Sequence, residues 1–108
     1  MDAPLLVYTT YPSLVEAETA GRGLVEKRLA ACVNIVPEMV SIFRWKGQVE
    51  RGHEVIMVIK TRQSLAEKVR VAVRANHPFE TPAILFLPAS GGDKDYIGWI
   101  MEETEGAK

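Results

Sequence analysis

Three short segments of this chain are apolar at every position, and they constrain its fold more than any other feature of the sequence. They span residues 5–7, 55–59 and 83–87. Successive side chains of a β-strand point to opposite faces of its sheet, so a strand of this kind needs cover on both faces. We therefore expect a sheet with helices on one face and further apolar cover on the other.

Two helices between these strands are predicted from the same start signal. Ser13 with Glu16, and Ser64 with Glu67, have the S-x-x-E spacing of a capping box, which satisfies free N–H groups of the first helical turn. The apolar residues at helical spacing that follow are expected to face the sheet. They are Ala17, Ala20, Leu24 and Val25 in the first helix, and Ala66, Val69 and Val73 in the second.

A long β-hairpin is predicted in the middle of the chain. In order, its parts are strand 32–36, a bend at Pro37, strand 40–45, a turn at Lys46-Gly47, a return strand 48–50 and an interruption at Arg51-Gly52. Trp45 lies near the tip of this arm. An aromatic side chain on a projecting arm is more often an interface anchor than a solvated residue.

The order of these elements gives the expected fold class. It is α+β, a ferredoxin-like βαββαβ sandwich with a long β-hairpin arm and a short C-terminal helix over residues 96–103, capped by Asp93 or Asp95. Residues 1–108 form one domain, which is large enough to build its own core. Two main helices cover only one face of a four-stranded sheet, so we expect self-association. The alternative is that the last helix folds back over the open face.

Charge and composition exclude several classes of partner. The chain has 13 basic and 14 acidic residues and a net charge of −1, so it lacks the basic surface expected for nucleic acid or an anionic membrane. No apolar run approaches the roughly 20 residues of a membrane span. Its first residues lack the pattern of a signal peptide, and its single cysteine cannot form an internal disulfide. We expect a cytoplasmic protein.

Few residues of the chain offer metal-binding or nucleophilic chemistry. Cys32 is the only thiol, and His77 lies near the carboxylate of Glu80. The alternatives are that Cys32 is a small core residue and that His77 is simply favoured at a helix C-terminus. One thiol and two separated imidazoles are too few for a closed four-ligand zinc site. Lys60 either extends to the rim of the sheet or lines a cavity with Glu80 and Tyr96.

Sequence signatures of common enzyme classes are absent. The chain contains no glycine-rich phosphate loop, no H-E-x-x-H and no G-x-S-x-G. An acylphosphatase-type activity on this fold would rest on the fold alone, which is a weak argument. We therefore do not expect an enzyme.

Five co-linear motifs resemble the CutA family, the divalent-cation tolerance proteins. They are RLAACVNIVP at 28–37, SIFRWKG at 41–47, IKT at 59–61, HPFETP at 77–82 and DYIGW at 95–99. The resemblance extends from residue 5 to about residue 103. It implies a ferredoxin-like subunit in a tight homotrimer whose arms grip neighbouring subunits. It also implies a cytoplasmic role in copper tolerance, with copper or other divalent ions as ligands.

The resemblance further implies clefts between subunits. Their expected metal ligands are His77, Cys32 and Glu80, and the other residues expected in the ligand cleft are Trp45, Lys60, Tyr96 and Thr9. Copper-binding members of the family can have cysteine where this chain has Thr9 and a second histidine where it has Asn76. Thiol and imidazole ligands favour copper over harder ions, so we expect weak copper binding. The alternative is a trimeric module similar to the PII regulators, which bind small molecules between subunits.

Overall fold

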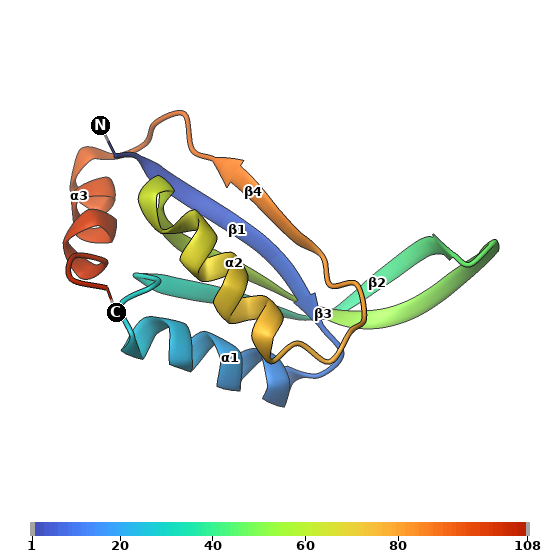
Figure 1. The fold of residues 1–108 in the computed structure, drawn as a ribbon. Coiled ribbons are helices and arrows are strands. Elements are labelled where there is room, and N and C mark those ends of the chain that lie inside the picture. The colour runs from blue at the N-terminus through green and yellow to red at the C-terminus, as the bar shows by residue number, and fades with distance from the viewer. Residues whose placement is uncertain (1, 108) are drawn as a thin grey trace.

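A computed structural model describes residues 2–107 of the chain. The elements are β1 (Pro4–Tyr11), α1 (Leu14–Glu26), β2 (Cys32–Trp45), β3 (Gln48–Arg62), the 3-10 turn η1 (Gln63–Leu65), α2 (Ala66–Ala75), β4 (Ile84–Pro88) and α3 (Lys94–Glu103). The strands form one antiparallel sheet in the order β2-β3-β1-β4, which is the ferredoxin-like arrangement predicted from the sequence. Helices α1 and α2 lie side by side on one face of this sheet (Figure 1).

The core lies between the sheet and these two helices. Alternate residues of the central strands face it and are almost fully buried: Leu5 and Val7 of β1, and Met57 and Ile59 of β3. The predicted helix stripes mostly pack here, including Ala17, Leu24, Val69 and Val73. Val25 is an exception and is 39% exposed. It follows Leu24 by one residue, and one residue turns an α-helix by about 100°, which carries its side chain away from the buried stripe.

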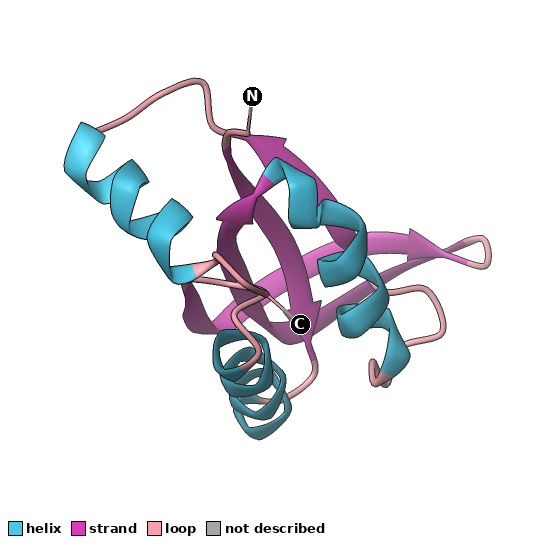
Figure 2. Cartoon of the chain, turned by 60° about the vertical axis from the view of Figure 1, so that its left-hand side comes forward, coloured by secondary structure: helices cyan, strands magenta, loops and turns pink. Residues whose placement is uncertain are grey.

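The hairpin projects well beyond the helices, as Figure 2 shows. The register of β2 against β3 shifts between Val36 and Met39, so the bend predicted at Pro37 is confirmed as a bulge. The predicted interruption at Arg51-Gly52 is wrong. Gly52 pairs with Ser41 and Arg51 with Ile42, because glycine keeps its backbone N–H and can remain in a ladder.

The three helix starts differ in how they are capped. Ser13 caps α1 as predicted: its hydroxyl accepts from the Glu16 N–H at 3.3 Å and donates to the Glu16 carboxylate at 2.8 Å. Asp93 caps α3, which begins at Lys94, earlier than predicted. The second predicted capping box is wrong. The chain first makes η1, and the Ser64 hydroxyl donates to the Asp2 carboxylate at 2.6 Å instead.

The second face of the sheet is largely open in this chain. The residues of β1 and β3 that face it, at even positions 4–8 and 56–62, are half-buried, and Leu85 and Leu87 of β4 are 61% and 47% exposed. The arm carries further exposed apolar side chains, among them Ile42 at 72% and Trp45 at 40%. Helix α3 lies at the opposite end of the sheet from the arm (Figure 1), so it covers only a corner of this face.

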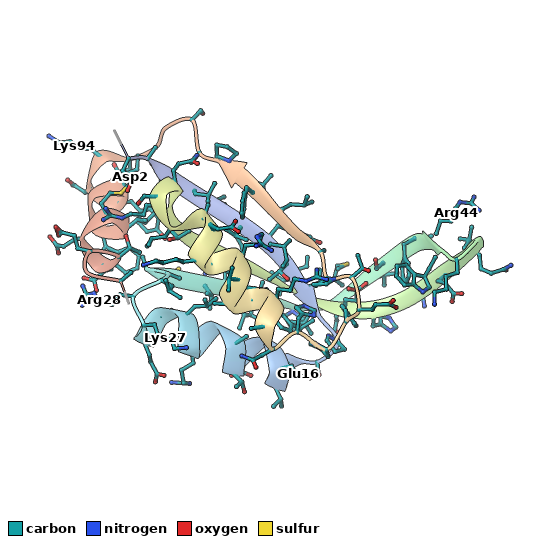
Figure 3. All side chains as sticks on the ribbon, in the orientation of Figure 1. Asp2, Glu16, Lys27, Arg28, Arg44 and Lys94 are labelled. Carbon is teal, nitrogen blue, oxygen red and sulfur yellow. The ribbon has the colours of Figure 1, made fainter. Side chains whose placement is uncertain are left out.

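Two guanidinium groups join α3 to the rest of the molecule, those of Arg28 and Arg62. Arg62, at the end of β3, donates to the Thr104 hydroxyl at 2.8 Å, to the Met101 carbonyl and to the Asp2 carboxylate at 3.3 Å. Asp2, which Figure 3 labels beside α3, thereby joins β1 to the same cluster.

Among residues 2–107, no helix has the length and apolar character needed to cross a bilayer.

Candidate functional site

Three of the predicted site residues meet on the open face of the sheet. Cys32 and Lys60 are directly opposite each other on β2 and β3, so their side chains share this face. The Lys60 ammonium donates a hydrogen bond of 2.8 Å to the Tyr96 hydroxyl of α3 and lies 5.1 Å from the centre of that ring. This hydrogen bond raises the pKa of Lys60, so the ammonium stays charged at neutral pH. We call Cys32, Lys60 and Tyr96 the sheet-face site.

An aromatic residue that the sequence reasoning missed extends this site. The rings of Tyr96 and Trp99 are 5.6 Å apart, and the two residues are 43% and 40% exposed. The signal was available, since residues three apart share one face of a helix. The sheet-face site therefore presents one cation, one thiol and an aromatic surface to any molecule that covers this face.

His77 uses both of its ring nitrogens within the chain. Nδ1 accepts a hydrogen bond from the Phe79 N–H at 3.1 Å, and Nε2 lies 2.7 Å from the Thr10 carbonyl. A carbonyl only accepts, so this arrangement assigns the proton of a neutral imidazole to Nε2. The ring also stacks on Tyr11, with centroids 4.5 Å apart. A metal ion could bind His77 only by displacing one of these hydrogen bonds.

The predicted metal ligands do not come together within one chain. Lys60 pairs with both Cys32 and Leu6, so Cys32 is level with Leu6 along the sheet, whereas His77 contacts Thr10. Four residues of strand separate these levels by about 13 Å. Glu80 follows in the α2–β4 loop, and its carbonyl accepts from Arg74 at 3.4 Å. Across residues 2–107 there is no group of three His, Cys, Asp or Glu side chains placed to hold a metal.

Thr9 and Trp45 also lie away from the sheet-face site. Thr9 is fully buried on the helix-covered face, between Met57 and Ile84 in neighbouring strands. Trp45 is at the tip of the arm opposite Gln48, and the 12 residues of β3 between that level and Lys60 span roughly 40 Å of strand. Only a second copy of the chain could bring a Trp45 ring to the sheet-face site.

These features define a class of protein: a ferredoxin-like subunit with a projecting apolar arm, an open sheet face and potential ligands that no single chain gathers. The model of the CutA1 divalent ion tolerance protein family matches residues 5–103. The chain belongs to this family, as its motifs predicted.

Relatives from several kingdoms support this assignment. The divalent-cation tolerance protein CutA of Archaeoglobus fulgidus is 44% identical over 99 residues, covering 92% of this chain and 96% of that protein. The protein of the same name from Thermus thermophilus is 42% identical with the same coverage. Protein CutA of the mouse is 42% identical over 98 residues, and there this chain spans only 55% of the relative's length.

A solved structure confirms the fold. The structure of the periplasmic divalent cation tolerance protein CutA from Archaeoglobus fulgidus superposes with a TM-score of 0.91 at 43% identity, covering 94% of this chain and 99% of that one.

Proposed function

We propose that this chain acts in divalent-cation tolerance as a homotrimer, and that it binds Cu(II) or another divalent ion weakly with ligands from more than one subunit. Family membership supports the role, since relatives that match almost their full length carry that name. The observation that carries the proposal is the separation of Cys32 from His77 within a chain whose sheet face and arm lack cover.

The available donors account for the expected weak affinity. Cys32 offers a thiol on the open face, and Glu80 offers a carboxylate in the loop after α2. His77 contributes only by giving up a hydrogen bond to Phe79 or Thr10, each worth about 1 kcal/mol. Thiol and imidazole donors favour copper, but each chain has only one of each at these positions.

A competitive Cu(II) titration tests this proposal. We expect saturable binding by the unmodified protein and weaker binding by Cys32→Ser and His77→Ala, with a trimeric native mass in the same buffer. His53→Ala is the matched control, since His53 lies on the arm opposite Val40. Unfolding of His77→Ala, measured without metal, shows how much stability the hydrogen bonds of His77 contribute apart from any role as a metal ligand. Equal binding by all four proteins would contradict the assigned ligands, and a monomeric native mass would contradict the assembly.

A second candidate function is favoured by the sheet-face site. The Lys60 ammonium is held against Tyr96, beside the exposed ring of Trp99, which suits a small organic anion with an unsaturated or aromatic part. We expect millimolar nucleotides or aromatic carboxylates to raise the melting temperature of the unmodified protein but not of Lys60→Met. An unchanged melting temperature across such a series would count against this candidate.

A further inference from the structure

The helix-covered side of the molecule contains a groove between α1 and α2, with a volume of about 310 Å³. Small and apolar residues form its walls, including Ala20 and Gly23 of α1 and Ala72 and Val73 of α2. A Cβ built on Gly23 would have no heavy atom within 4 Å, so this part of the wall borders open space. The volume falls at the lower end of the range found for small-molecule sites.

Tyr11 contributes an unused polar group to this groove. The residue lines the groove and is 2% exposed, and its hydroxyl has no hydrogen-bond partner among residues 2–107. The His77 ring, stacked 4.5 Å away, restricts the movement of the Tyr11 ring. A buried hydroxyl without a partner is unfavourable, because it has lost its hydrogen bonds to water. A bound molecule that supplies an oxygen would remove this cost.

The charges around the groove restrict what that molecule can be. Burial, with a further contribution from the carboxylate of Glu16, raises the pKa of Tyr11 to about 12, so the phenol keeps its proton at neutral pH and can donate. Glu16 and Lys27 both line the groove, and Figure 3 shows them near opposite ends of α1. Near Tyr11 the groove therefore offers the phenol as a donor and the Glu16 carboxylate as an anionic acceptor, which would repel an anion at this end.

We propose that the α1–α2 groove binds a small uncharged molecule with an apolar body and one hydroxyl group, which accepts a hydrogen bond from Tyr11 and donates one to Glu16. The apolar body lies between Ala20, Gly23 and Ala72. This inference does not rest on the proposed function, because none of Cys32, His77 and Glu80 lines the groove, although His77 stacks on Tyr11. Failure of either proposal leaves the other intact.

Three probes with the same ring test the inference on the full chain. Cyclohexanol has the required hydroxyl, methylcyclohexane lacks it, and cyclohexanecarboxylate carries a negative charge. In an NMR titration we expect cyclohexanol to shift the amide signals of Ala20, Gly23 and Ala72, and to bind more tightly than the other two probes. Tyr11→Phe should weaken cyclohexanol binding about tenfold and leave methylcyclohexane binding unchanged.

Two further variants separate binding in the groove from binding elsewhere. Gly23→Leu places a side chain in the groove and should abolish binding of cyclohexanol. Gly98→Leu changes a glycine of α3 whose Cβ would also meet open space, and it should bind as the unmodified protein does. Absence of groove shifts at millimolar cyclohexanol would overturn the proposal. So would equal affinities for cyclohexanol and methylcyclohexane in the unmodified protein, a comparison that needs no variant to fold.

Discussion

Two glycines of α1, separated by a single residue, have opposite surroundings. A Cβ on Gly21 would lie 2.7 Å from a methyl carbon of Val33 and 3.1 Å from the Met57 sulfur, so α1 can approach the sheet only because this position has no side chain. Gly23 borders the groove and meets nothing within 4 Å. The first glycine therefore sets how closely the helix packs on the sheet, whereas the second does not.

This difference predicts stability changes of opposite sign for one substitution. Gly21→Ala should destabilise the fold by about 1–3 kcal/mol through overpacking. Gly23→Ala should stabilise it by about 0.5–1 kcal/mol, since alanine loses less backbone entropy in a helix. Denaturant unfolding of both variants at one protein concentration measures the two effects. A gain in stability for Gly21→Ala would contradict this prediction, because it would show that the Val33 and Met57 side chains can move away at little cost.

Among the elements, the two predicted capping boxes show what a sequence pattern can and cannot establish. Ser13 and Ser64 stand in the same S-x-x-E spacing, yet only Ser13 caps its helix. Ser64 bonds instead to the Asp2 carboxylate, which the N-terminal end of β1 brings within 2.6 Å. That contact is between residues far apart in the chain, so local spacing could not reveal it.

The same distinction explains how much of the site was predictable. Element order and the bulge near Pro37 follow from local patterns, and the structure has them. The grouping of Cys32 with Lys60 and Tyr96 was implied only by the family resemblance. The face on which Thr9 lies depends on the register of β1 against β3, which local spacing does not fix. Both hydrogen bonds of His77 depend on where the α2–β4 loop closes. Trp99 was visible in its motif, but its stacking on Tyr96 required the helix.

The bond between Asp2 and Ser64 predicts a pH dependence that joins two elements. The Ser64 hydroxyl, with smaller contributions from backbone N–H groups and Arg62, lowers the pKa of Asp2 below its ordinary value of 3.8. A carboxyl whose pKa is lower in the folded state stabilises the fold above the ordinary pKa, and this contribution is lost as the pH falls through the folded value. Stability from this bond is therefore present at neutral pH and disappears in acid.

Asp2→Asn isolates this contribution from those of the other carboxyl groups. We expect the variant to unfold more easily than the unmodified protein at neutral pH, and the difference to shrink below pH 3.8. Urea unfolding of both proteins, at neutral pH and again below pH 3.8, measures this difference in stability. A difference that stays constant with pH would mean that the charge of Asp2 contributes nothing.

On the scale of the whole molecule, the arm is where self-association can be tested. Trp45 lies at its tip, where 40% of this large aromatic residue is exposed in the single chain. Trp45→Ala should therefore weaken association by about 2 kcal/mol or more, as expected for a buried aromatic anchor. Native mass recorded over a dilution series measures this effect. Val71→Ala is the control, because Val71 is 53% exposed on α2, away from the arm; an equal loss in both variants would remove the special role of Trp45.

The cluster around Arg62 has a consequence for how the molecule opens. Its guanidinium holds the N-terminal end of β1 through Asp2 and the C-terminal end of α3 through Thr104 and the Met101 carbonyl. Fraying of either segment removes one of the partners that hold this guanidinium in place for the other. Cooperative units of this kind exchange their amide hydrogens together. The first strand and the last helix, distant in sequence, should thus gain and lose protection against exchange as one unit.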